Sequence, residues 1–148
     1  MMYNKPAEIL LVDDAPDDVE IICQALKAQQ RNSRLHVANS GSDALDYLYK
    51  RGAYTAAQRP DLVLLNLPGS NGRDVLTYAK ANPGLCDIPI IVLTGGVALP
   101  ADVIDICNLH ANCYIAKPKD PKNYMDMLQS VLNFWLQVAR LPSAITSQ

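Results

Sequence analysis

The chain alternates between two patterns of hydrophobic and polar residues. Short, continuous apolar runs occur at residues 8–12, 61–65 and 89–93. Runs of this kind, without polar alternation, are typical of parallel strands that are covered on both faces of a sheet. Residues 34–38 and 112–116 are two further candidate strands. The pattern therefore predicts five strands.

The segments that follow these strands repeat their apolar residues every three or four positions. In the first of them, Val19, Ile22 and Leu26 recur at the period of an amphipathic helix. Ser40 is a candidate N-cap of the second. Helices are expected at residues 16–28, 40–49, 73–81, 100–109 and 121–140. Five strands that are each followed by a helix indicate an α/β fold with a doubly wound parallel sheet and right-handed crossovers.

Polar side chains stand where four of the predicted strands end. They are Asp13 and Asp14 after the first strand, Asn66 after the third, Thr94 after the fourth and Lys117 after the fifth. Ligands of open parallel α/β sheets bind beyond these strand ends. Carboxylates suit Mg²⁺, and a lysine with a hydroxyl suits phosphoryl oxygens. Asp13-Asp14 followed by Pro16 is, taken alone, better explained as a turn and helix cap, but the combination indicates phosphoryl chemistry.

Composition narrows the classes of function. The chain has 148 residues, of which 49% are hydrophobic and 19% charged, and its formal net charge is -2. Because phosphate-backbone binding requires clustered Lys and Arg, we do not expect a nucleic-acid partner. No run approaches the roughly 20 apolar residues that span a bilayer, and residues 1–6 do not resemble a signal peptide. We expect a cytoplasmic single domain over residues 1–148, with its core at about 7–141 and a tail at 142–148.

Four motifs, in this order, resemble the response-regulator receiver domain. They are Val12-Asp13-Asp14, Leu64-Leu65-Asn66, Leu93-Thr94-Gly95 and Tyr114-Ile115-Ala116-Lys117-Pro118. Further stretches resemble the stand-alone regulators paired with bacterial and cyanobacterial phytochromes. These are residues 47–54, Asn66-Leu67-Pro68 with residues 71–76, and Phe134-Trp135-Leu136 with Leu141-Pro142. The resemblance implies a flavodoxin-like (βα)5 fold with strand order 2-1-3-4-5.

The resemblance also implies roles for individual residues. Asp13 and Asp14 match the acidic pair that binds Mg²⁺, Thr94 the switch hydroxyl, Tyr114 the switch aromatic, Lys117 the lysine that contacts the phosphoryl group, and Pro118 a proline whose preceding peptide bond is often cis. The implied partner is a histidine kinase, with a phytochrome as one candidate, or a sister response regulator.

Asn66 departs from the family pattern, which has a phosphoacceptor Asp here, a Pro four residues later and a Gly eight later. In this chain Pro68 and Gly72 follow at offsets of two and six. Either Asn66 replaces the Asp directly and the loop is shorter, or an Asp-Leu pair is absent and Asn66 matches the residue two positions past the acceptor. The Asn-Leu-Pro spacing of the relatives favours the second alignment. Neither leaves a carboxylate, and an amide is a far poorer nucleophile.

We therefore predict a pseudo-receiver that is not phosphorylated, that is not an enzyme, and that acts through protein–protein interaction. It needs no cofactor, and its Mg²⁺ site at Asp13 and Asp14 is weak or lost because one anionic ligand is missing. One alternative is a receiver that accepts the phosphoryl group on Asp13 or Asp14. Another is a flavodoxin-like small-molecule binder, but no glycine-rich phosphate loop follows the first strand.

The last predicted helix carries more apolar residues than one core-facing stripe needs. Tyr124, Leu128, Val131, Trp135 and Val138 are spaced alternately by four and three, as in a helix-packing seam. We expect this seam to be an exposed face for homodimerisation or partner docking. The alternative is a helix that is simply buried in its own domain.

Overall fold

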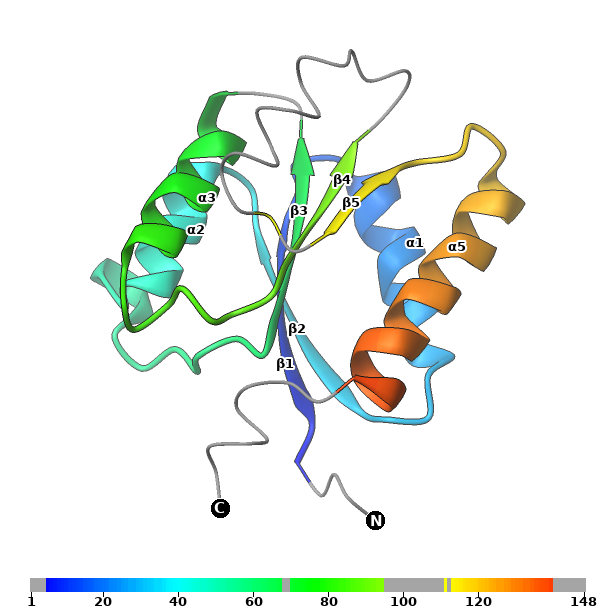
Figure 1. Ribbon diagram of the computed structural model, residues 1–148, viewed down its shortest axis with the longest axis horizontal. Helices are drawn as coiled ribbons and strands as arrows, with labels where there is room; N and C mark the ends of the chain where they lie inside the picture. The colour runs from blue at the N-terminus through cyan, green and yellow to red at the C-terminus, as the bar shows by residue number, and fades with distance from the viewer. Residues whose placement is uncertain (1–4, 68–69, 95–110, 112, 140–148) are drawn as a thin grey trace.

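Five parallel strands form a single sheet in the computed structural model, which describes residues 5–67, 70–94, 111 and 113–139. The order across the sheet is β2-β1-β3-β4-β5, as Figure 1 shows. The strands are β1 (Ala7–Val12), β2 (Ser33–Ala38), β3 (Leu62–Leu67), β4 (Ile90–Thr94) and β5 (Cys113–Ala116). The predicted flavodoxin-like strand order is confirmed.

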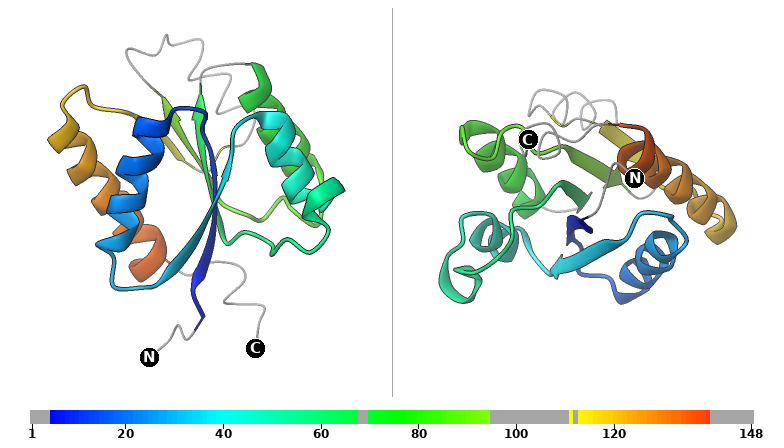
Figure 2. Two further views of the ribbon diagram at one scale, coloured as in Figure 1. Left: turned by 180° about the vertical axis from the view of Figure 1, so that it is seen from behind. Right: turned by 90° about the horizontal axis from the view of Figure 1, so that it is seen from below.

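Helices cover both faces of the sheet (Figures 1 and 2). One face carries α1 (Pro16–Lys27) and α5 (Pro121–Asn133), and the other carries α2 (Gly41–Leu48) and α3 (Ser70–Ala81). A π-helical segment, Phe134–Val138, extends α5, and a short 3₁₀ turn, Gly52–Tyr54, follows α2. The helix predicted at residues 100–109 lies outside the described residues. No helix in the described part of the chain has both the length and the apolar character needed to cross a bilayer.

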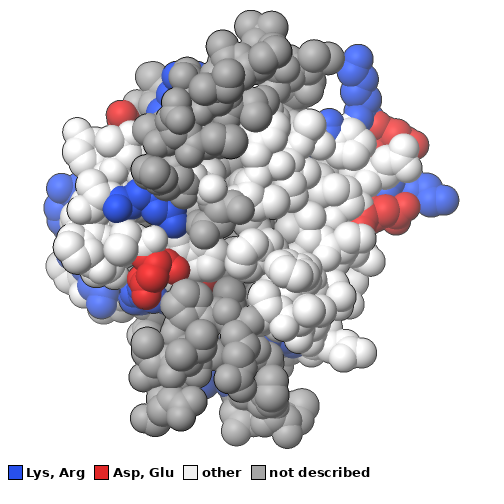
Figure 3. Space-filling model, in the orientation of Figure 1, with Lys and Arg blue, Asp and Glu red and all other residues white. Residues whose placement is uncertain are grey.

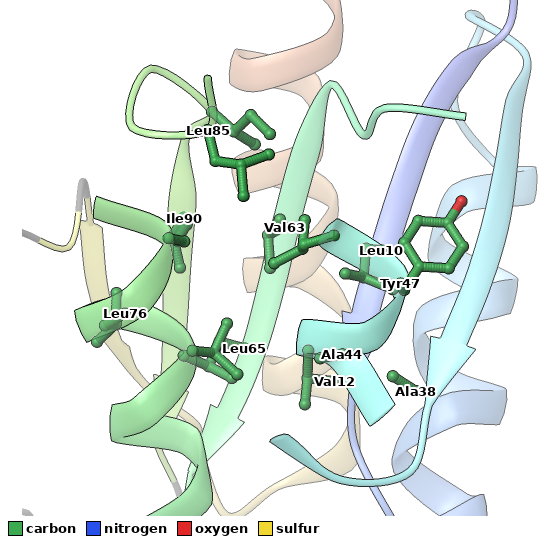
Figure 4. Packing of buried hydrophobic residues seen from close by; sticks show 14 of the residues in the cluster. Leu10, Val12, Ala38, Ala44, Tyr47, Val63, Leu65, Leu76, Leu85 and Ile90 are labelled. Carbon is green, nitrogen blue, oxygen red and sulfur yellow. The ribbon is translucent and has the colours of Figure 1, made fainter. Parts of the chain in front are cut away.

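The central strands have continuous apolar sequences because they bury side chains on both faces. Leu10 and Val63 belong to a cluster that packs under α2 and α3, shown in Figure 4. Ile9 and Leu62, one position earlier on the same strands, belong to the cluster under α1 and α5. Successive side chains of a strand point to opposite faces, so each run supplies both clusters.

Local signals in the sequence fix where helices begin. The backbone N–H of Asp43 donates to the Ser40 hydroxyl oxygen at 3.1 Å, which confirms Ser40 as the N-cap of α2. Pro16 starts α1, where a missing N–H has no consequence. The Tyr54 hydroxyl donates to the Asp43 carboxylate at 2.9 Å and thereby fastens the segment after α2 to that helix.

Strand β3 is longer than the apolar run that predicts it. Asn66 pairs with Leu93 and Leu67 pairs with Thr94, so β3 continues for two residues past Leu65. The apolar run predicts a strand that ends at Leu65, because Asn is rare in strands. Pairing with β4, which extends equally far, overrides that preference and makes Asn66 a strand residue.

Candidate functional site

The ends of β1 and β3 bring Asp13 and Asn66 side by side. Val12 pairs with Leu65, and Asp13 and Asn66 are the next residues along the chain. Asn66 is half-buried, and Asp13 is 4% exposed. The two residues predicted to end the first and third strands therefore meet at the carboxyl edge of the sheet.

Asp13 is held by one backbone N–H on one of its carboxylate oxygens. The N–H of Ala15 donates to Oδ1 at 2.9 Å, whereas Oδ2 is buried and has no well-formed hydrogen bond among the described residues. Burial raises the pKa of Asp13 above its usual value, and the Ala15 N–H and the nearby Asn66 amide oppose that rise. Asp14, the next residue, is exposed.

Asp18 joins the site although the sequence does not mark it as a site residue. Its Oδ2 accepts a hydrogen bond from Asn66 Nδ2 at 3.3 Å and forms an ion pair with Lys117 Nζ at 2.9 Å. Acidic residues at the start of a helix are favoured by the helix dipole, so the sequence alone indicates no further role for Asp18. A usable signal was the one-turn spacing between Asp18 and the fully buried Ile22, which places Asp18 on the core-facing side of α1.

Lys117 lies at the other edge of the same site. Its backbone N–H donates to the Thr94 carbonyl at 2.7 Å, which places it directly beside the end of β4. The Lys117 ammonium lies 5.9 Å from the centre of the Tyr124 ring. Burial raises the pKa of Tyr124, and the nearby Asp18 and Asp13 carboxylates raise it further.

The peptide bond before Pro118 is trans. It differs from the cis bond that is frequent in receivers, and the cis and trans isomers of bonds that precede proline differ little in energy.

Thr94 and Tyr114 contact each other. The Thr94 side chain is nearly buried and its hydroxyl donates to the Tyr114 hydroxyl at 3.1 Å. Tyr114 packs against the cluster under α2 and α3. The two predicted switch residues therefore form a bonded pair next to the Asp13–Asn66–Lys117 group.

The oxygens of this site have the chemistry of a divalent-cation site. Asp13 Oδ2 and Asn66 Oδ1 are both buried without a hydrogen-bond partner in the described part of the chain. Carboxylate and amide oxygens are ligands that Mg²⁺ accepts. Within residues 5–67, 70–94, 111 and 113–139, no group of three or more His, Cys, Asp and Glu side chains could hold a metal. The residues present fit a cation held by Asp13 and Asn66, with Asp14 near solvent.

A cavity of about 280 Å³ opens beside the site, between α1 and the start of α5. Asp18, Lys117 and Tyr124 form part of its wall, together with Lys119. Solvent and small ions therefore reach the Asp18–Lys117 pair from the side of the molecule.

The predicted seam on the last helix divides into two stripes. Tyr124 and Leu128 are 5% and 1% exposed and belong to the core under α1 and α5, so their assignment to an exposed face is wrong. Tyr124, Leu128, Leu132 and Leu136 recur every four residues and form the stripe that packs on the sheet. Val131 and Trp135 are half-buried, and Val138 is 65% exposed.

Comparison with known proteins agrees with this geometry. Residues 9–129 match the response regulator receiver domain family. Response regulator Rcp1 of Synechocystis sp. is 38% identical over 143 residues, which cover 95% of this chain and 97% of Rcp1. The crystal structure of the phosphorylated cyanobacterial phytochrome response regulator RcpA is 35% identical, has a TM-score of 0.88, and is matched over 94% of this chain and 100% of RcpA.

The Mn²⁺-bound form of Rcp1 is similar as well. It is 37% identical with a TM-score of 0.87, over 93% of this chain and 99% of that one. These similarities confirm the resemblance to phytochrome response regulators that the motifs indicate. The chain therefore belongs to the response regulator receiver domain family and is a response regulator of two-component signalling.

Proposed function

We propose that this protein is a pseudo-receiver, which is not phosphorylated and acts in two-component signalling by binding other proteins. The observation that carries the proposal is the amide of Asn66 at the end of β3, beside Asp13 and within the hydrogen-bonded group that includes Lys117. A receiver requires a carboxylate nucleophile at this place to form an acyl phosphate. Asn66 has no such nucleophile.

The strand register supports direct replacement of the acceptor by Asn66. Leu65 pairs with Val12, so Asn66 stands next to the first residue of the acidic pair. The loop is then shortened behind Asn66, before α3. This differs from the alignment that the Asn-Leu-Pro spacing favours, because that spacing describes the loop and not the strand.

The carboxylates around Asn66 are poorly suited to replace the missing acceptor. Asp13 is buried, and its Oδ1 is bonded to a backbone N–H, so little of this carboxylate is accessible to a phosphoryl donor. Asp18 is paired with Lys117. An acceptor at Asp13 therefore has less support than the pseudo-receiver, whereas Asp14 is exposed and stays the alternative acceptor.

The partners that we propose are a histidine kinase of the phytochrome type or a sister response regulator. RcpA, which is named a phytochrome response regulator, and Rcp1 match nearly the whole chain. Binding without phosphorylation would let this protein compete with a phosphorylatable regulator for the same kinase. A cation held weakly by Asp13 and Asn66 is compatible with this role.

A homodimer through the end of the last helix is the second part of the proposal. Phe134 and Val138 are 50% and 65% exposed and lie one turn apart, next to Val131 and Trp135. The Phe134 and Trp135 rings meet edge to face with centroids 5.4 Å apart. Figure 3 shows a broad area without charged side chains on the side of the molecule where α5 lies. Exposed apolar side chains that lie together, as Phe134 and Val138 do, are typical of a protein–protein interface.

Intact mass spectrometry tests the absence of phosphorylation. The protein is incubated with acetyl phosphate and Mg²⁺, with a phosphorylatable receiver treated in parallel as the positive control. We expect an adduct on the control and an unchanged mass for this protein. A stoichiometric, acid-labile phosphoryl adduct on the wild-type chain would contradict the proposal, and peptide mapping would then identify the carboxylate that carries it.

A further inference from the structure

We infer that Asp18 supplies, from helix α1, the negative charge that residue 66 does not supply from β3, and that it thereby positions Lys117 and Asn66. The inference rests on the proposed function, because it assumes that Asn66 stands where a receiver has its acceptor carboxylate. It adds a residue that neither the motifs nor the family resemblance assigns to the site.

A single oxygen of Asp18 connects three elements of the fold. Its Oδ2 accepts from Asn66 Nδ2 at 3.3 Å and from Lys117 Nζ at 2.9 Å. These residues are 48 and 99 positions away from Asp18 along the chain. The contact therefore ties the end of β3 and the segment after β5 to the first turn of α1.

The partial burial of Lys117 favours a counter-charge of this kind. Its side chain is 13% exposed and that of Asp18 is 25% exposed, although a cavity connects the pair to solvent. Loss of its anionic partner therefore leaves a partly desolvated ammonium without compensation. Asp13 attracts Lys117 from a greater distance, but in the described part of the chain only Asp18 forms an ion pair with this lysine.

The helix dipole does not account for the position of Asp18. Asp17 and Asp18 both lie in the first turn of α1, where a negative charge is favourable. Asp17 is exposed, whereas Asp18 is half-buried against Lys117 and Asn66. A dipole effect alone is equally served by an exposed side chain, so the specific contact indicates a second role.

The consequence for the site is that it tolerates a carboxylate at position 66 or at position 18, but not at both. Asn66→Asp on its own places three carboxylates, at positions 13, 18 and 66, around one ammonium, and like charges at this distance disfavour ionisation. Asp18→Asn on its own leaves Lys117 without its partner. The double variant keeps the wild-type charge and moves it from α1 to β3.

Urea denaturation of four variants tests this exchange. We expect Asp18→Asn to lower the folding equilibrium constant about tenfold, the typical contribution of one hydrogen bond between charged groups. Asn66→Asp should lower the folding equilibrium constant as well. In the double variant Asp18→Asn/Asn66→Asp this constant should return to within about threefold of the wild-type value. Asp17→Asn, in the same helical turn, is the matched control and should change it less than about threefold.

Rescue distinguishes a positioning role from a merely structural one, because a capping or packing defect at Asp18 on α1 is not repaired by a carboxylate on β3. The inference would be overturned if the two single changes acted independently, so that their effects on the folding equilibrium constant multiplied in the double variant. It would also be overturned if Asp17→Asn and Asp18→Asn lowered this constant equally. If Asp18→Asn does not fold, a cooperative transition in the double variant supports the inference, and a double variant that also fails to fold overturns it.

The same proteins separate this inference from the proposed function. A phosphoryl adduct on the wild-type chain contradicts the proposed function but leaves the coupling between positions 18 and 66 as measured. Failure of the rescue with an unmodified wild-type chain contradicts only the role of Asp18.

Discussion

The Thr94 hydroxyl donates a hydrogen bond to the Tyr114 hydroxyl at 3.1 Å, between the end of β4 and the middle of β5. Thr94 is 8% exposed, so its hydroxyl has little access to water. The pair is thus satisfied within the protein, and no charged group of the Asp13–Asn66–Lys117 site takes part in this bond. In a receiver without a phosphoryl group, such a bond holds these two residues in one arrangement.

Removal of the Tyr114 hydroxyl tests this relationship. Tyr114→Phe leaves a nearly buried donor on Thr94 without its acceptor, so we expect the free energy of unfolding to fall by about 1–2 kcal/mol. Tyr49→Phe is a matched control, since the Tyr49 hydroxyl donates to the Tyr78 carbonyl at an exposed position, and it should cost less than about 0.5 kcal/mol. Equal losses in urea denaturation would show that the Thr94–Tyr114 bond adds nothing to stability.

The buried carboxylate of Asp13 makes stability depend on pH. Burial raises the pKa of Asp13 in the folded state above its ordinary value of 3.8. The folded state therefore favours the protonated acid, and its stability falls as pH rises from about 3.8 through the raised pKa. Each unit of separation between the folded and unfolded pKa corresponds to about 1.4 kcal/mol.

We accordingly expect Asp13→Asn to be more stable than wild type at neutral pH without divalent cations, and the difference to disappear below about pH 3.8. Thermal unfolding of both proteins from pH 3 to 8 measures it. A wild-type protein that is the more stable one at pH 7 would contradict the cost of burying this charge.

Divalent cations should make the wild type more stable than Asp13→Asn, because they can bind the buried oxygens Asp13 Oδ2 and Asn66 Oδ1, which lack partners in the described structure. For a weak site with a Kd of about 1 mM, 10 mM Mg²⁺ stabilises the wild type by about 1.4 kcal/mol. Asp13→Asn should lose this gain, and Asp87→Asn, an exposed carboxylate elsewhere on the surface, should keep it. Thermal shift with and without EDTA is the measurement, and an identical Mg²⁺ response in all three proteins would exclude this site.

Much of the fold could be predicted from the sequence because each apolar run feeds two cores at once. Leu10 and Ile9 belong to opposite clusters, so the strand admits no polar face, and that pattern is visible without a structure. The ends of elements were less predictable. Asn66 extends β3 only because β4 lies beside it, and that pairing depends on the assembled sheet.

The sequence predicts the site residues that follow strand ends, but it does not identify Asp18. Its role depends on the approach of α1 to Lys117, which is 99 positions away. Similarly, the last helix has apolar residues on two sides, and sequence spacing cannot tell which side the sheet covers. Tyr124 and Leu128 face the sheet, whereas Val138 does not.

This division of the last helix decides which variants test the dimer. Trp135 packs partly against the core, so Trp135→Ala combines loss of an interface with loss of core contacts. Phe134 and Val138 are the most exposed apolar residues of this segment, so Phe134→Ser/Val138→Ser should leave the fold intact. We expect wild type to show a dimer mass in light scattering that is independent of concentration, and the double variant to be monomeric.

Two controls give this prediction its specificity. Tyr78→Ser removes an aromatic side chain of similar exposure from α3 and should leave the dimer unchanged. Leu132→Ala removes a fully buried side chain of the core-facing stripe and should cost about 2–5 kcal/mol of stability. A wild-type monomer at all concentrations would refute the dimer. A dimer that survives Phe134→Ser/Val138→Ser would place its interface on another surface, since the apolar area at the end of the last helix would then be too small and too polar to hold two chains together.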